Sequence, residues 1–155
     1  MDYSIPGYQT LHITNLLLDY NGTIALDGSL LPGVKEALIR LSADFSIYVL
    51  TADTHGTAKA MCGELPVTIL TFPSDTAMES KLEIVNRLGA ASCAAIGNGR
   101  NDCKMCQASA LSVAVLGEEG MYSGLIASTD VCTRSILDAL ALLEKPKRLI
   151  ATLRG

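Results

Sequence analysis

The sequence predicts an α/β fold, a doubly wound parallel sheet in a single domain spanning residues 1–155, and three observations support this prediction. Short apolar runs alternate along the chain with longer stretches of helical periodicity, which is typical of parallel sheets with right-handed crossovers. Hydrophobic residues make up 49% of the chain but aromatic residues only 5%, so the core must be aliphatic, as in a sheet covered by helices. The length of 155 residues suits one core of ordinary size.

Each expected strand is a short apolar run. In chain order the runs are His12–Leu18, Phe45–Leu50, Val67–Leu70, Cys93–Ile96 and Leu111–Val115, with a weaker sixth at Leu125–Ala127. Between and after them, apolar residues recur at intervals of three and four, which predicts helices. The expected helices are Pro32–Ser42, Thr57–Cys62, Ala77–Leu88, Asp102–Ala108, Thr133–Leu143 and Pro146–Leu153.

Several strands end at residues that can do chemistry. Asp19 and Thr51 each come directly after an apolar run, and Asn98 and Asp102 follow a third run. Because ligands of open parallel sheets bind beyond the carboxyl ends of the strands, we expect these side chains to converge on one crevice. The short spacings between them leave no room for a cap domain, so the crevice should be open to solvent.

Charge and hydropathy exclude several classes of partner. The net charge is −4 and the largest basic cluster is Lys145–Arg148, which argues against nucleic acid. No stretch approaches the roughly 20 apolar residues of a membrane span, and the N-terminus does not resemble a signal peptide. We therefore expect a soluble, cytoplasmic protein without membrane association. The apolar composition is compatible with a homo-oligomer.

The five cysteines predict reduced, buried thiols rather than a disulfide framework, because their number is odd and they are scattered through apolar segments. Cys103 and Cys106 form a single Cys-x-x-Cys pair. A structural zinc site normally needs a second pair of Cys or His ligands. We therefore expect these two cysteines to pack a helix.

The first candidate motif is Asp19-Tyr20-Asn21-Gly22-Thr23, in which an apolar strand delivers a carboxylate to a sharp turn. Gly22 permits the turn, and backbone N–H groups in such a turn can face an anion. A carboxylate in this position can attack a phosphoryl group and form an aspartyl-phosphate. On this motif alone, an Asp that merely starts a turn is an equally good explanation.

Three further motifs follow in the chain. Thr51, in Val49-Leu50-Thr51-Ala52-Asp53-Thr54, puts a hydroxyl at the end of the second strand. Lys81 lies in the first turns of the helix Ala77–Leu88, where a solvated cation is the ordinary explanation. The segment Gly97–Asp102 reads Gly-Asn-Gly-Arg-Asn-Asp, and its sixth residue is not the Gly of a dinucleotide-binding loop.

In this order the four motifs resemble those of the haloacid dehalogenase (HAD) superfamily, over nearly the whole chain. The branch they resemble most is the phosphorylation domain of P-type ATPases, here without membrane helices or an inserted nucleotide-binding domain. The resemblance implies that Asp19 is the nucleophile and a Mg²⁺ ligand. It also implies that the backbone carbonyl of Asn21 and the side chains of Asn98 and Asp102 complete the metal site.

The resemblance also implies a phosphate-binding set. The hydroxyl of Thr51, together with Ala52, would hold the phosphoryl oxygens, as would the backbone amides of Gly22 and Thr23. Lys81 would neutralise the charge of the phosphate and of the nucleophile. Asn21 and Lys81 would thus count with Asp19 and Thr51 among the catalytic residues.

Two departures from the family pattern set the expected activity. Asn21 stands where the family's phosphatases carry a general acid/base Asp, and Asn98 stands where a metal-binding Asp is usual. We therefore expect a slow Mg²⁺-dependent phosphohydrolase or phosphotransferase acting on a phosphorylated small molecule or protein. Two alternatives remain open: a catalytically silent domain that binds a phosphorylated ligand or protein partner, and a regulator phosphorylated at Asp19 by ATP.

Overall fold

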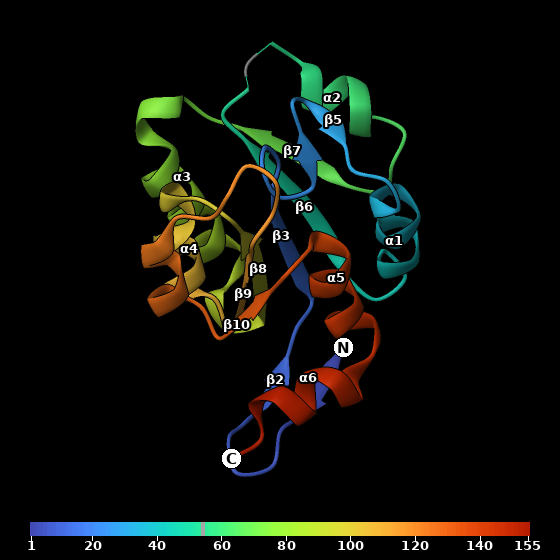
Figure 1. The fold of residues 1–155 in the computed structure, drawn as a ribbon, viewed down its shortest axis with the longest axis vertical. Coiled ribbons are helices and arrows are strands. Elements are labelled where there is room, and N and C mark those ends of the chain that lie inside the picture. Colours follow the sequence, from blue (N-terminus) through green and yellow to red (C-terminus); the bar gives the residue numbers. More distant parts are fainter. Residues whose placement is uncertain (54) are drawn as a thin grey trace.

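The computed structural model describes residues 1–53 and 55–155, so Thr54 of the second motif lies outside the described residues. A six-stranded parallel sheet, in the order β10-β9-β8-β3-β6-β7, forms its centre (Figure 1). The strands are β3 (Asn15–Asp19), β6 (Ser46–Thr51), β7 (Thr68–Thr71), β8 (Cys93–Gly97), β9 (Leu111–Val115) and β10 (Val131–Thr133). After β3 the chain adds β6 and then β7 on one side of β3. It then crosses to the other side of β3, where it forms β8, and continues outward through β9 and β10. This confirms the doubly wound α/β fold, with the topological switch point between β3 and β8.

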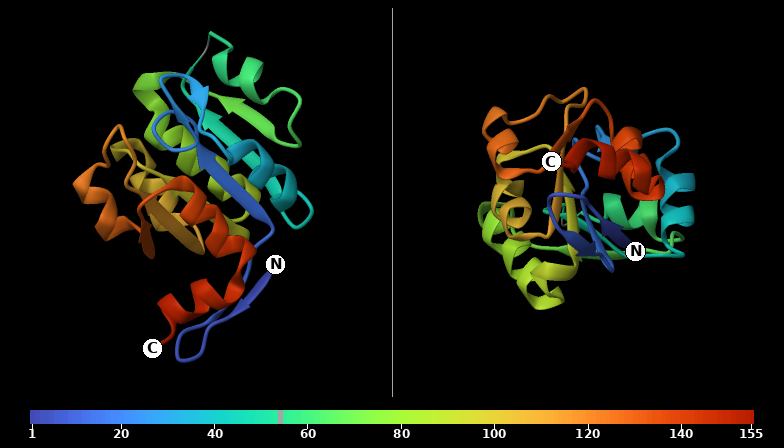
Figure 2. Two further views of the ribbon diagram at one scale, coloured as in Figure 1. Left: turned by 45° about the vertical axis from the view of Figure 1, so that its right-hand side comes forward. Right: turned by 90° about the horizontal axis from the view of Figure 1, so that it is seen from below.

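Helices cover both faces of the sheet (Figures 1 and 2). They are α1 (Val34–Leu41), α2 (Thr57–Cys62), α3 (Ala77–Leu88), α4 (Cys103–Ala108), α5 (Ile136–Glu144) and α6 (Pro146–Leu153). Buried residues of α1, α2, α5 and α6 share one hydrophobic cluster with Leu16 and Leu18, whereas those of α3 and α4 share another with Leu17. Successive residues of β3 thus point to opposite layers, which explains why the strand is apolar without interruption.

The N-terminal part of the chain differs from the expectation of one strand over His12–Leu18. An antiparallel hairpin, β1 (Asp2–Ser4) with β2 (Thr10–His12), precedes β3 and lies beside α6 (Figure 1). Burial alternates through β2, whereas every residue from Leu16 to Tyr20 is buried. The apolar pattern therefore merges a half-exposed strand with a fully buried one. His12 belongs to the former and is exposed, with its Nδ1 3.0 Å from Asp2 Oδ1.

One other local prediction is corrected, and one small hairpin was not predicted. The segment expected as the sixth strand, Leu125–Ala127, lies in the 3-10 helix η4 (Ser123–Ser128), and β10 follows it. β10 pairs in parallel with β9, and two of its three residues, Val131 and Thr133, are β-branched, as is typical of strands. A small hairpin, β4 (Ala25–Leu26) with β5 (Ser29–Leu30), follows the first motif. Its Asp27-Gly28 turn has both φ angles positive, at 51° and 83°, as such tight turns require.

The connections agree with the expectation that there is no cap. Within residues 1–53 and 55–155 the segments between strands form single helices, short turns or the β4–β5 hairpin, and no cap domain. The described helices include none that is both long and apolar enough to cross a bilayer.

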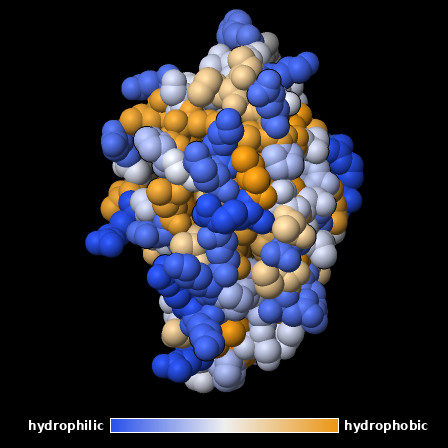
Figure 3. Space-filling view, turned by 90° about the vertical axis from the view of Figure 1, so that its right-hand side faces the viewer, coloured by the Kyte–Doolittle hydropathy of each residue, from blue (hydrophilic) through white to orange (hydrophobic). Residues whose placement is uncertain are grey.

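The surface and the cysteines bear on two further predictions. Ile39 of α1 and Leu137 of α5 are 49% and 42% exposed, and the face seen in Figure 3 mixes hydrophobic with hydrophilic side chains. A homo-oligomer therefore stays a prediction. The five cysteines are free, as expected, but only Cys62, Cys93 and Cys106 are buried; Cys103 is half-buried and Cys132 is exposed. Cys106 lies on the buried face of α4, where burial raises the pKa of its thiol.

Candidate active site

The predicted site residues gather at the carboxyl ends of β3, β6 and β8. A cavity of about 440 Å³ lies there. Six of the nine predicted residues line it, namely Asp19, Asn21, Thr51, Ala52, Lys81 and Asn98. The sheet explains the convergence, because β3 pairs with β6 on one side and with β8 on the other.

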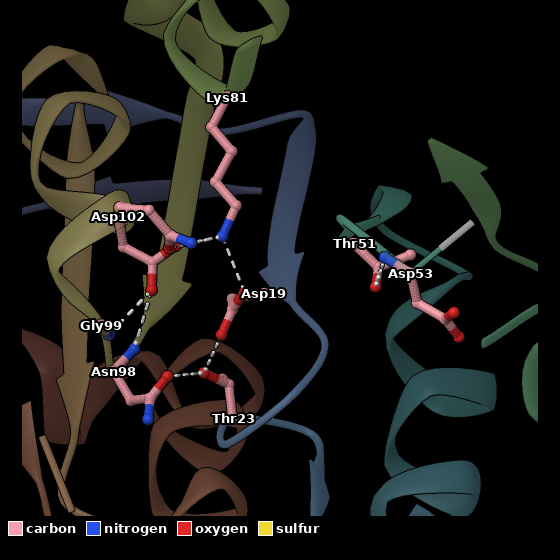
Figure 4. A network of polar contacts seen from close by, with 9 residues as sticks. Asp19, Thr23, Thr51, Asp53, Lys81, Asn98, Gly99 and Asp102 are labelled. Atoms are coloured by element: carbon pink, nitrogen blue, oxygen red, sulfur yellow. Dashed lines mark hydrogen bonds and ion pairs between the residues drawn. The ribbon is translucent and has the colours of Figure 1, made fainter. Parts of the chain in front are cut away.

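Lys81 is the centre of a buried network of polar contacts (Figure 4). Its side chain extends from α3 and is only 1% exposed. The ammonium Nζ lies 2.7 Å from Asp19 Oδ1, 2.6 Å from Asp102 Oδ1 and 3.0 Å from Asn101 Oδ1. All three of its N–H bonds therefore have an acceptor, and the ordinary explanation of Lys81 as a solvated helix residue is excluded.

The charges of this network do not cancel. Two carboxylates, Asp19 and Asp102, share the single ammonium of Lys81. Burial, and then the charge of Asp102, raises the pKa of Asp19 from 3.8 to about 7. Burial opposes the charged form of Lys81, but the two carboxylates outweigh it and raise the pKa of the lysine. The ionised site carries a net negative charge, which favours the binding of a cation.

Asp102 fixes the loop after β8. Its Oδ2 accepts hydrogen bonds from the backbone N–H groups of Asn98 at 3.0 Å and Gly99 at 2.9 Å, while its Oδ1 faces Lys81. The side chain is fully buried and packs against Gly97, where a Cβ would overlap the Asp102 carboxyl group. Both oxygens of Asp102 are thus occupied by groups of this chain. The role of Asp102 as a metal ligand stays a prediction.

Gly97 offers a direct test of this packing. We expect Gly97→Ala to lower the free energy of unfolding by about 1–3 kcal/mol, because the new methyl group displaces the buried carboxyl of Asp102. Thermal unfolding measures the change. Gly99→Ala is the matched control, since a Cβ there would approach the nearest side-chain atoms only to 3.6 Å. Equal stability of the two variants would contradict the packing argument.

Thr23 connects the first and fourth motifs. Its Oγ1 lies 2.9 Å from Asp19 Oδ2 and 3.3 Å from Asn98 Oδ1. A hydroxyl has one proton, and the shorter contact favours its donation to the carboxylate. The amide nitrogen Nδ2 of Asn98 donates to the backbone carbonyl of Gly120, at 3.1 Å. Thr23 and Lys81 thus hold the two oxygens of Asp19 from opposite sides (Figure 4).

The backbone amides of the first loop differ from the expectation. The N–H of Gly22 donates to the carbonyl of Ala25 at 2.8 Å, and that of Thr23 to the carbonyl of Tyr20 at 3.3 Å. These two amides close the tight loop and do not face an anion. The N–H groups of Asn21 and Ala52, by contrast, have no acceptor among the residues that the structure describes.

Thr51 stands at the end of β6 and is 3% exposed. Its Oγ1 accepts a hydrogen bond from the N–H of Asp53 at 3.0 Å, so its own proton is available to an acceptor in the cavity (Figure 4). The carboxylate of Asp53 turns away and accepts from the N–H groups of His55 and Thr57. These hydrogen bonds lower the pKa of Asp53, and the one from the N–H of His55 has the largest effect. The role of Asp53 is therefore to hold the loop.

Asn101 and Glu119 are among the cavity residues to which the sequence assigned no role. Asn101 accepts from Lys81, and Glu119 lines the cavity from the loop after β9. Asn101 belongs to the fourth motif and its role depends on tertiary contacts. Glu119 did carry a signal, because two glycines flank the pair Glu118-Glu119 and predict a turn that presents acidic side chains.

Comparisons with known proteins agree with this architecture. A family model described as haloacid dehalogenase-like hydrolase matches residues 1–109. An uncharacterized protein of Methanocaldococcus jannaschii is 45% identical over 60 residues, which are 39% of this chain and 64% of that protein. The match thus spans less than two thirds of the relative's length.

Solved structures share the fold. The 3-deoxy-D-manno-octulosonate 8-phosphate phosphatase of Moraxella catarrhalis, in complex with magnesium, phosphate and KDO, has a TM-score of 0.69 at 16% identity. The similarity covers 92% of this chain and 94% of that one. A zinc-transporting PIB-type ATPase has a TM-score of 0.64 at 24% identity, over 79% of this chain and 20% of the ATPase. At these identities the likeness concerns the fold alone.

Proposed function

Because the chain belongs to the haloacid dehalogenase-like hydrolases, we propose that it transfers phosphoryl groups from phosphate monoesters through Asp19, with Mg²⁺ as cofactor. One observation carries this proposal. The carboxylate of Asp19 ends the central strand β3 at the wall of the cavity, with one oxygen bonded to Lys81 and the other to Thr23. These bonds fix the side chain in one orientation, as a nucleophile requires.

The donor set fits Mg²⁺. Asp19, the backbone carbonyl of Asn21 and the amide oxygen of Asn98 offer hard oxygen atoms around the same cavity, and Mg²⁺ prefers such ligands. The net negative charge of Asp19, Asp102 and Lys81 favours a cation as well. Asp102 would act by holding Lys81 and the Asn98 loop. Bound Mg²⁺ would supply charge stabilisation to the phosphoryl oxygens and the nucleophile.

The residues of this chain suggest how the reaction proceeds. The Thr51 hydroxyl and the N–H groups of Asn21 and Ala52 would donate to the phosphoryl oxygens, while Lys81 balances the growing charge. An oxygen of Asp19 would form a bond to phosphorus as the ester P–O bond breaks. Water would then attack the aspartyl-phosphate, which releases phosphate and restores the carboxylate.

Asn21 would make both steps slow. Its side chain is exposed at the mouth of the cavity, and an amide can neither protonate the departing alkoxide nor take a proton from the attacking water. The alkoxide would have to take its proton from solvent. The same observation favours a second candidate function, a catalytically silent domain that binds a phosphorylated small molecule or protein.

Hydrolysis of p-nitrophenyl phosphate, with and without Mg²⁺, separates the two candidates. The proposal expects slow turnover that requires Mg²⁺. A wild-type protein that shows none, and gains none when Asn21 is replaced by Asp, would leave the binding domain and the regulator as the remaining functions. Labelling with acetyl phosphate and with ATP tests the regulator, which requires that ATP label Asp19.

Asn21→Asp is expected to increase turnover of p-nitrophenyl phosphate by about 10²–10⁴-fold, the usual contribution of a general acid/base. Steady-state kinetics at saturating Mg²⁺ measure the effect. Asn86→Asp is the matched control, because Asn86 is exposed on α3 and does not line the cavity. A similar increase in both variants would show that added negative charge, rather than the acid/base at position 21, is responsible.

A further inference from the structure

A tight turn brings an acidic side chain to the candidate site. Gly117 and Gly120 close the turn after β9, with the N–H of Gly120 donating to the carbonyl of Gly117 at 3.0 Å. Gly120 has φ of +81°, a conformation that L side chains rarely adopt. Glu118 and Glu119 occupy the tip. Both glutamates line a neighbouring, apolar cavity, but only Glu119 also lines the cavity of Asp19 and Asn98.

Asn98 anchors this turn. Its side-chain Nδ2 donates to the carbonyl of Gly120 at 3.1 Å, and its backbone carbonyl accepts from the N–H of Tyr122 at 2.8 Å. A Cβ on Gly22 would overlap both Glu119 Oε2 and Asn98 Nδ2. The carboxylate of Glu119 and the amide of Asn98 therefore both lie beside Gly22, in the loop that begins at Asp19.

This arrangement explains why position 98 carries an amide. A carboxylate there would put an acceptor oxygen against the carbonyl of Gly120 and a negative charge beside Glu119. Both contacts would be repulsive, whereas the Asn98 amide supplies the donor that the Gly120 carbonyl needs. The neutral residue at position 98 and the charged residue at position 119 are thus two parts of one arrangement.

We propose that Glu119 is a metal-binding residue of this site and supplies, directly or through one water, the acidic oxygen that Asn98 does not provide. The inference rests on the proposed function, since it concerns the same divalent cation. Asp19 would contribute one carboxylate from β3 and Glu119 a second from the turn after β9, on either side of Asn98. Carboxylate oxygens are the ligands that Mg²⁺ prefers, so both charges should contribute to its affinity.

Titration calorimetry of the full chain with Mg²⁺ alone tests the inference. Glu119→Gln is expected to weaken Mg²⁺ binding by roughly 10–100-fold, the usual effect of removing a group that supports a metal site. Glu118→Gln, on the same turn, is the matched control and should change the affinity by no more than about twofold, since solvent and salt screen its charge. The double variant Asn98→Asp/Glu119→Gln should bind Mg²⁺ more tightly than Glu119→Gln, because it returns one carboxylate to the site.

The outcomes distinguish this inference from the proposed function. Thermal unfolding in metal-free buffer checks that the exposed Glu119 can be replaced without loss of the fold. Wild-type affinity in Glu119→Gln, or equal losses in Glu118→Gln and Glu119→Gln, would overturn the inference alone if the wild type still hydrolyses p-nitrophenyl phosphate with Mg²⁺. A wild-type protein that binds no Mg²⁺ would overturn both.

Discussion

Replacing Lys81 by Met is expected to lower the free energy of unfolding by about 3–5 kcal/mol, the usual cost of leaving a buried charge without its partner. Lys81 is the shared cation of Asp19 and Asp102, and its ammonium lies within 2.7 Å of an oxygen of each. Met keeps the length of the side chain and its packing on α3 but removes the charge. The two carboxylates would then face each other without compensation, and one would have to take up a proton.

Urea unfolding at pH 8 in metal-free buffer measures this effect. Lys104→Met is the matched control, because Lys104 pairs with Glu79 at the surface, where an ion pair contributes only about 0–1 kcal/mol. Adding Asp102→Asn to Lys81→Met should recover part of the lost stability, since only one buried carboxylate then remains. A Lys81→Met protein as stable as Lys104→Met would show that the buried network does not hold the site together.

Some residues of this network could be placed from the sequence pattern alone, and others could not. The uninterrupted apolar run before Asp19, and the Gly that follows it, predicted that a carboxylate ends a buried strand. The alternation of strands and helices then predicted that Thr51 and Asn98 lie beside it, as the cavity shows. Lys81 could be assigned only through the family resemblance, because helical periodicity does not say that a Lys is buried between two carboxylates.

The detailed hydrogen bonding could not be predicted. The loop geometry decides that the N–H groups of Gly22 and Thr23 bond to carbonyls of their own loop and that Asp102 uses both oxygens within the chain. Such choices depend on φ and ψ angles and on contacts far apart in sequence. The same holds for Glu119, which is 100 residues from Asp19 and reaches the cavity only because β9 lies two strands from β3.

Asp19→Asn is expected to abolish Mg²⁺-dependent turnover and at the same time to stabilise the metal-free protein. An amide oxygen is a poor nucleophile, so turnover should fall by more than about 10³-fold. The loss is best measured in the Asn21→Asp background, where the starting rate is expected to be higher. Asp75→Asn, in an exposed segment before α3, is the matched control and should keep the activity of its parent.

The gain in stability follows from the charge count. Asn at position 19 leaves Lys81 paired one to one with Asp102, so the excess negative charge disappears. The variant should exceed the wild type by about 1–3 kcal/mol in free energy of unfolding at pH 8, since each unit of pKa shift corresponds to about 1.4 kcal/mol. A site shaped for catalysis often lowers stability in this way.

The pH dependence of that gain identifies its cause. Asp19 has a pKa of about 7 in the folded protein and an ordinary value of 3.8. Below about pH 4 the carboxyl is protonated in both the folded and the unfolded chain, so wild type and Asp19→Asn should be equally stable. Between pH 4 and pH 7 the folded wild type binds a proton that the unfolded chain has lost, and its stability falls as the pH rises. The difference in free energy of unfolding between Asp19→Asn and the wild type should therefore grow from pH 4 to pH 7 and stay constant above pH 7.

Adding Mg²⁺ should have the opposite effect, because it favours the wild type over Asp19→Asn. The cation stabilises the wild type in proportion to its binding, but it should stabilise Asp19→Asn far less, because that variant has lost a charged ligand. Adding Mg²⁺ at pH 8 should therefore narrow or reverse the gap in melting temperature. An Asp19→Asn protein that is less stable than the wild type at pH 8 without metal would mean that Lys81 and Thr23 fully compensate the carboxylate, and the excess negative charge inferred for the site would be wrong.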